Sequence, residues 1–258
     1  MKLLRDTWLI FQRQALLQLR QPVWIFIGIF QPVMYLLLFA PLLKPALEGP
    51  LGLTTNAEVY RVFVPGMLVL IAIFGGLFQG FGLIAELRAG VIERSRVTPI
   101  SRLALLLGRS LRDAMTLVVQ AVIITVLALF FGLRTNLGDV LLAYLMLALI
   151  ALMTSAVSYG VALKVRSEDA LAPLMNTVAQ PVFLLSGILL PISVEYGAPS
   201  WLVNVAKVNP FSWAVDGVRA LFAGDIGDPK VWQSLVITSV LAALAVVWAA
   251  RSFARTVR

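Results

Sequence analysis

Six long stretches without Asp, Glu, Lys or Arg constrain this sequence more than any other feature. Each contains 20 to 25 residues. They lie between Arg20 and Lys44, Arg61 and Glu86, Asp113 and Arg134, Asp139 and Lys164, Asp169 and Glu195, and Lys230 and Arg251. A helix of about 20 residues crosses a hydrocarbon layer of about 30 Å, and a charge at its centre costs about 2.5–3.5 kcal/mol. We therefore expect an all-α integral membrane protein with six transmembrane helices.

The composition argues against a water-soluble fold. Of the 258 residues, 60% are hydrophobic and 13% are charged, whereas an average soluble domain has roughly 45–50% apolar and about 25% charged residues. The stretches are apolar on every side, unlike the helices at the surface of a soluble protein. We place the spans at about residues 22–43, 62–85, 105–133, 140–163, 170–192 and 231–250, within one transmembrane domain of residues 22–258.

The positions of the basic residues predict the orientation of the chain. With the N-terminus inside the cell, 15 of the 21 Lys and Arg residues lie on the cytoplasmic side, as the positive-inside rule requires. We expect a multi-pass protein of the cell membrane with both termini in the cytoplasm. The net charge of +8 then reflects topology and not nucleic acid binding, which needs a soluble basic surface. The longest cytoplasmic connection runs from about Glu86 to Asp113.

Residues 1–21 predict an amphipathic helix that lies in the cytoplasmic interface of the membrane. Its apolar side chains share one helical face: Leu4, Trp8, Phe11, Ala15 and Leu19. Its charged side chains occupy the opposite face: Lys2, Asp6, Arg13 and Arg20. Two interpretations remain open, a simple membrane anchor or a lever whose Trp8, Phe11 and Arg13 lie beside a cytoplasmic partner.

Residues 86–102 form a charged segment between the second and third spans. Glu86, Gly90, Glu93 and Val97 recur at helical spacing, and Thr98-Pro99 ends such a helix. The pattern favours a docking helix over an ordinary basic loop, because a loop explains the arginines but not two glutamates in register. Ser101 is expected to cap the helix that follows. The candidate coupling residues are Glu86, Arg88, Gly90, Glu93, Arg94, Thr98, Pro99 and Ser101.

The external segment, residues 193–230, is punctuated by prolines and glycines. Its pieces Trp201–Lys207 and Phe211–Phe222 predict two short helices that lie at the external surface or re-enter the membrane. Asp216 and Arg219 are three residues apart, a spacing that permits an ion pair within one helix. We favour a structural role for this pair over ligand binding.

Much chemistry is absent from the sequence. The chain has no histidine, no cysteine and no phosphate-binding loop, which excludes a thiolate metal site, a Ser-His relay and ATP hydrolysis by the P-loop route. The charge-free stretches also lack the intramembrane carboxylates of proton- or sodium-coupled carriers. A substrate path would use the polar side chains within the spans, which otherwise serve as contacts between helices. These candidates are Gln31, Tyr35, Gln79, Asn176 and Gln180.

Two ordered motifs resemble those of the permease subunits of type-2 ABC exporters, especially the daunorubicin-resistance-type drug exporters. In the cytoplasmic segment the resemblance is carried by Glu86, Arg88, Gly90, Glu93, Thr98, Pro99 and Ser101. In the external segment it is carried by Ser186, Gly187, Pro191, Trp201, Leu202, Asn209, Pro210, Phe211, Ser212, Val215, Asp216 and Arg219. The chain departs from the family pattern at Val91, Ile92, Ser95 and Arg96, all within the docking segment.

The resemblance implies a transport subunit and not an enzyme. It implies two copies of a separate ATP-binding subunit, which bind ATP and Mg, so that this chain needs no cofactor of its own. It also implies a second permease subunit, because six spans make half a transporter; we favour a homodimer, and a heterodimer with a similar permease stays open. The implied substrate is a lipophilic drug or natural-product-like compound that is exported across the bilayer. Export of a lipid or lipid-linked polysaccharide is the first alternative, and a secondary transporter is the weaker one.

Overall fold

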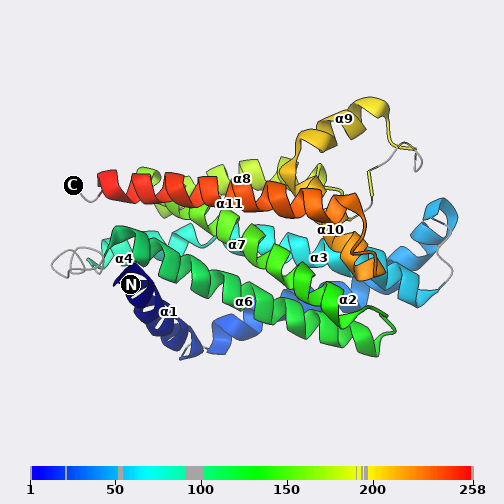
Figure 1. Ribbon diagram of the computed structural model, residues 1–258, viewed down its shortest axis with the longest axis horizontal. Coiled ribbons are helices and arrows are strands. Elements are labelled where there is room, and N and C mark those ends of the chain that lie inside the picture. The colour runs from blue at the N-terminus through cyan, green and yellow to red at the C-terminus, as the bar shows by residue number, and fades with distance from the viewer. Residues whose placement is uncertain are drawn as a thin grey trace.

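The computed structural model describes residues 2–20, 22–51, 55–90, 101–189, 191–192, 194 and 197–256. Every regular element within these ranges is a helix (Figure 1), which confirms the all-α prediction. The helices are α1 (Lys2–Leu19), α2 (Pro22–Leu51), α3 (Asn56–Leu77), α4 (Gly80–Arg88), α6 (Arg102–Phe130), α7 (Leu137–Val165), α8 (Glu168–Leu184), α9 (Ser200–Val208), α10 (Pro210–Ala223) and α11 (Pro229–Thr256).

Four segments of the described chain are long and apolar enough to cross a membrane. They are Ala57–Arg88, which comprises α3 and α4, Leu103–Phe130, Leu137–Val165 and Pro229–Phe253, and they fall in the second, third, fourth and sixth predicted spans. In α2 the continuous apolar stretch whose side chains the structure describes is Phe26–Leu38. Helix α8 has 17 residues, or about 25 Å at 1.5 Å per residue. The chain is thus a helical membrane protein, whereas a total of six spans stays a prediction.

The long helices lie side by side along the longest axis of the molecule (Figure 1). The start of α1, the end of α4, the start of α6 and the end of α11 lie at one end, on the left of the figure. We call this the termini end. Helix α10 and the connection between α6 and α7 lie at the other end, which we call the opposite end. Positions expected in the cytoplasm therefore gather at one end of the bundle.

Helix α7 is the centre of the bundle, and it packs against α3, α6, α10 and α11. More than half of its residues are buried. Small residues bring the helices close together. An added Cβ at Gly76 of α3 would lie 1.9 Å from Thr154 of α7, and one at Gly217 of α10 would lie 2.0 Å from Ser234 of α11. Lipid offers little hydrophobic drive for helix association, so such close backbone approach supplies much of the attraction.

The helix formed by α3 and α4 is broken between Leu77 and Gly80. A side chain of α7 bridges this break, because the hydroxyl of Ser158 donates to the carbonyl oxygen of Leu77 and accepts from the backbone N–H of Gly80 at 2.9 Å. Backbone groups that lose their helical partners inside a membrane protein need another partner. Ser158 therefore makes the break compatible with a buried position and joins it to the central helix.

The contact between α7 and α11 gives a first prediction. A Cβ at Gly160 would lie 2.1 Å from the ring of Trp248, so Gly160→Val should destabilise the fold by about 1–3 kcal/mol through overpacking. The measurement is the thermal unfolding midpoint in detergent. Gly138→Val on the same helix is the matched control, because nothing lies within 4 Å of a Cβ there. Equal midpoints for the two variants would contradict the packing of α7 against α11.

Candidate functional site

The predicted coupling segment begins inside α4. Glu86 and Arg88 belong to the last turns of this helix, and the backbone of Gly90 has a φ of 67° in the left-handed region. The predicted continuous helix through Glu86 and Gly90 is therefore wrong, because the chain leaves the helix at Arg88, where glycine permits the turn. Four candidates lie outside the described residues: Glu93, Arg94, Thr98 and Pro99. Ser101 caps α6 as predicted, since its hydroxyl accepts from the N–H of Ala104 at 3.0 Å.

Two ion pairs join the end of α4 to neighbouring helices. Glu86 pairs with Arg109 of α6, and Arg88 lies 3.4 Å from Glu168 at the start of α8. The second pair is exposed on both sides and contributes less than about 1 kcal/mol. The first differs, because the Arg109 side chain is only 7% exposed. The glutamate that sequence analysis assigned to a docking surface thus also contacts the interior of the bundle.

The positions of the charged residues of α6 differ from a second expectation. Sequence analysis placed Arg109, Arg112 and Asp113 in a cytoplasmic connection, whereas the structure places them in the first half of a 29-residue helix, with Asp113 completely buried. The helix begins early because Ser101 caps it, and α1 and α7 pack against it. Asp113 has two partners: the hydroxyl of Tyr159 donates to one of its oxygens, and Arg112 lies 2.9 Å from the other.

Helix α1 packs on α6 through a polar face. It forms a helix as predicted, but Asp6 is buried instead of exposed with the other charged side chains. The reason is a close approach of the helices, since a Cβ at Gly108 of α6 would lie 2.7 Å from Ile10 and 2.9 Å from the carbonyl oxygen of Thr7. The amide oxygen of Gln18 accepts from Thr116 at 3.0 Å and from Arg112 at 3.3 Å.

The other side of α1 remains open. Trp8 is 53% exposed and stacks on Phe11 with ring centroids 5.1 Å apart, and Arg13 is exposed. Leu4 and Leu19 are exposed on the same apolar side as Trp8. Exposed apolar side chains next to basic ones are typical of a helix in a membrane interface. This face is available to lipid or to a protein partner.

The external motif, with Asn209, Pro210 and Arg219, lies at the opposite end and joins three helices. Asn209 caps α10, because its side-chain oxygen accepts from the N–H of Phe211 at 3.0 Å, and its amide donates to the carbonyl oxygen of Val182 in α8 at 2.8 Å. Pro210 occupies the first turn of α10. Arg219 donates to the carbonyl oxygens of Val62 at 3.2 Å and Ile188 at 2.9 Å. These bonds satisfy carbonyl groups near the ends of α3 and α8.

A cavity of about 250 Å³ lies beside this motif. Its lining includes Asp216 and Trp213 of α10, Lys207 of α9 and Lys230 of α11. The Asp216 side chain is exposed, whereas the Arg219 side chain extends toward α3 and the segment after α8. The two short helices that sequence analysis predicted correspond to α9 and α10. The hydrogen bonds of Asn209 and Arg219 join α10 to α8 and α3, while the ion pair of Asp216 with Arg219 and its structural role stay a prediction.

Three of the five candidate path residues are exposed on the surface of the bundle, and two are half-buried. Gln31 is exposed and Tyr35 is half-buried on α2, while Gln79 is half-buried in the break between α3 and α4. Asn176 and Gln180 are exposed on α8. Both α2 and α8 pack against α3. The structure therefore places these polar groups on surfaces that flank α3 and not in the core of one chain.

A ladder of phenylalanines, which sequence analysis missed, follows the same region. Phe74, Phe78 and Phe81 stack in succession with ring centroids 6.3 Å and 5.8 Å apart, and Phe183 of α8 meets Phe74 edge-on at 6.0 Å. We call these four residues the phenylalanine ladder. All four are half-buried. The i, i+4, i+7 spacing of the first three could have indicated it, because such residues share one helical face.

The long apolar helices and the charged clusters at the termini end define a multi-span membrane protein with internal polar links between its helices. The sequence matches the profile of the family described as ABC-2 type transporter over residues 5–223, and the chain belongs to this family. Its members are permease subunits of ABC transporters, which lack an ATPase site of their own. The resemblance drawn from the two motifs is therefore confirmed.

Similar proteins carry consistent names. The chain is 28% identical over 217 residues to a protein of Porphyra purpurea named transport permease ycf38, covering 82% of this chain and 72% of that protein. It is 25% identical over 230 residues to the daunorubicin resistance ABC transporter permease protein DrrB1 of Streptomyces coeruleorubidus, covering 88% and 77%. A further ycf38 permease, from Cyanophora paradoxa, is 25% identical over 207 residues, covering 79% and 69%.

Proposed function

We propose that this chain exports a lipophilic, drug-like or natural-product-like compound as the membrane half of an ATP-driven transporter. The observation that carries the substrate class is the phenylalanine ladder, a stack of half-buried rings beside Gln79. Aromatic rings attract other rings in offset or edge-to-face geometry, with about 0.5–1.5 kcal/mol per pair beyond area burial. The name of the daunorubicin resistance relative supports the same class.

The energy for transport comes from a separate ATP-binding subunit in two copies, which hold ATP and Mg. Family membership supports this partner, and the termini end offers the surfaces for it. The end of α4 leads into residues 91–100, where Glu93, Arg94, Thr98 and Pro99 lie in sequence. Helix α1 contributes the exposed Arg13 and the half-buried Phe11. In this arrangement the termini end faces the cytoplasm and the opposite end faces outward, across a cell membrane that the chain spans six times.

A second permease subunit, in a homodimer, completes the path. Helix α8 supports this proposal, because Asn176, Thr177 and Gln180 are exposed on it. Polar side chains that face the hydrocarbon layer are unfavourable, and in membrane proteins such groups face a neighbouring helix or a water-filled path. A second copy against α8 would bring the polar residues of two chains together around the substrate.

The test uses the chain co-purified with its proposed ATP-binding subunit and reconstituted in lipid nanodiscs. Daunorubicin is the probe for planar aromatic compounds, and a lipid-linked oligosaccharide is the probe for the alternative class. We expect daunorubicin to stimulate ATP hydrolysis. Stimulation by the oligosaccharide alone would replace the proposed substrate class, and transport without any ATP-binding partner would indicate a secondary carrier.

A ladder variant makes the substrate prediction specific. Phe78→Ala should raise the half-maximal concentration of daunorubicin for ATPase stimulation about three- to tenfold, because it removes the central ring of the stack. Phe130→Ala is the matched control, since that ring is 83% exposed at the far end of α6 and lies outside the ladder. A daunorubicin response unchanged in Phe78→Ala would remove the ladder from the substrate path.

A further inference from the structure

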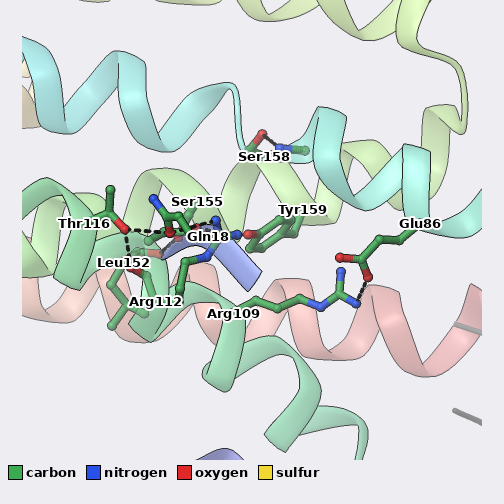
Figure 2. A network of polar contacts seen from close by, with 11 residues as sticks. Gln18, Glu86, Arg109, Arg112, Thr116, Leu152, Ser155, Ser158 and Tyr159 are labelled. Atoms are coloured by element: carbon green, nitrogen blue, oxygen red, sulfur yellow. Dashed lines mark hydrogen bonds and ion pairs between the residues drawn. The ribbon is translucent and has the colours of Figure 1, made fainter. Parts of the chain in front are cut away.

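One polar cluster connects α1 and α4, the described elements that the proposed function places near the ATP-binding subunit. It lies on the first half of α6 and consists of Arg109, Arg112 and Asp113, with Tyr159 of α7. Figure 2 shows Arg109, Arg112 and Tyr159 together with Glu86 and Gln18. Glu86 of α4 reaches it through Arg109. Gln18 of α1 reaches it through Arg112 at 3.3 Å. The two cytoplasmic elements therefore meet on adjacent turns of a single helix.

On the α7 side of the cluster, three consecutive residues contact three different parts of the molecule. Ser158 bridges the break between Leu77 and Gly80. Tyr159 donates to Asp113, and Gly160 forms the close contact with Trp248 of α11. A shift of α6 that displaces Tyr159 would therefore also displace the break in the second predicted span and α11.

The cluster is not a fully satisfied structural network. Among the described residues, none is a hydrogen-bond partner of the buried Nε atoms of Arg109 and Arg112. Arg112 and Asp113 form an ion pair at 2.9 Å, yet this oxygen of Asp113 also lacks a hydrogen bond. Buried groups that are only half satisfied reduce stability and, in native proteins, gather where a function needs them. An apolar interior would hold α6 and α7 together at least as firmly.

We propose that Arg109, Arg112, Asp113 and Tyr159 form a relay that passes displacement of α1 and α4 to α7, and hence to the break at Leu77–Gly80 and to α11. This inference rests on the proposed function, because it assigns positioning residues for ATP-coupled transport. Arg109 takes the displacement of α4 from Glu86, and Arg112 takes that of α1 from Gln18. Asp113 and Tyr159 pass both to the centre of the bundle.

The first test removes one oxygen atom from the relay. In the nanodisc complex, Tyr159→Phe should lower the number of drug molecules transported per ATP hydrolysed by about fivefold or more, the range of measured coupling between sites. Tyr144→Phe on the same helix is the matched control and should keep the wild-type ratio. The thermal unfolding midpoint is measured for both variants. If Tyr159→Phe lowers the number of drug molecules transported per ATP but leaves the thermal unfolding midpoint unchanged, the hydroxyl acts in coupling and not in stability.

The second test reverses the ion pair that receives the displacement of α4. Glu86→Arg and Arg109→Glu should each lower the ratio, and the double variant should recover most of it, because the pair is restored with its charges exchanged. A wild-type ratio in Tyr159→Phe, or a double variant no better than the singles, overturns the relay. A wild-type chain that binds no ATP-binding subunit would instead refute the proposed function, so the two failures are distinguishable.

Discussion

Asp113→Ala is expected to destabilise the protein by about 3–5 kcal/mol, the usual effect of removing one partner from a buried ion pair. The carboxylate is completely buried and neutralises Arg112 at 2.9 Å, while it accepts the hydroxyl of Tyr159. Alanine would leave a half-buried guanidinium and a buried hydroxyl without these partners. The thermal unfolding midpoint in detergent, compared with that of the unchanged chain, measures the effect.

Two further variants give this prediction its controls. Asp225→Ala removes an exposed carboxylate near the end of α10 and should change stability by less than about 0.5 kcal/mol. The double variant Arg112→Met with Asp113→Leu should lose less stability than Asp113→Ala alone, because no unpaired charge remains in the interior. If Asp113→Ala and Asp225→Ala unfold at the same temperature, the buried position of Asp113 is wrong.

Length and hydrophobicity predicted most of the helices because these are local properties of the chain. The cap at Ser101 and the helices around Trp201 and Phe211 also depend on a few neighbouring residues, so their signals are in the sequence. The break between α3 and α4 has no such signal. It depends on Ser158, which lies 81 residues after Leu77 and replaces the lost backbone partners.

The buried charges of α6 could not be predicted by the rule that found the spans. That rule treats each charged residue as an end of a charge-free stretch, so Arg109 and Asp113 were counted with the cytoplasmic connection although the third predicted span, 105–133, includes them. They are tolerated inside because Glu86 and Tyr159, 23 residues before one and 46 residues after the other, supply partners. A charge can enter the bundle wherever distant residues compensate it. Asp6 is likewise buried by a contact between distant segments, that of α1 with Gly108 of α6.

Gly108→Val is expected to detach α1 from α6, and it has the second largest predicted effect. The added side chain would lie 2.7 Å from Ile10 and 2.9 Å from the carbonyl oxygen of Thr7. The second contact is with backbone, so rotation of a side chain cannot relieve it. Helix α1 must move as a whole, which also pulls Gln18 from Arg112 and Thr116. Overpacking of this kind costs about 1–3 kcal/mol in addition to the lost polar contacts.

Spin labels can measure this displacement, because the chain has no cysteine of its own. Labels at Arg13→Cys on α1 and Leu111→Cys on α6, both exposed, should give one narrow distance distribution in the parent chain and a longer, broader one in Gly108→Val. Gly138→Val should leave the distribution unchanged. An unchanged distribution in Gly108→Val would contradict the contact. Since Glu86 reaches α6 independently of α1, Gly108→Val should weaken coupled transport without abolishing it.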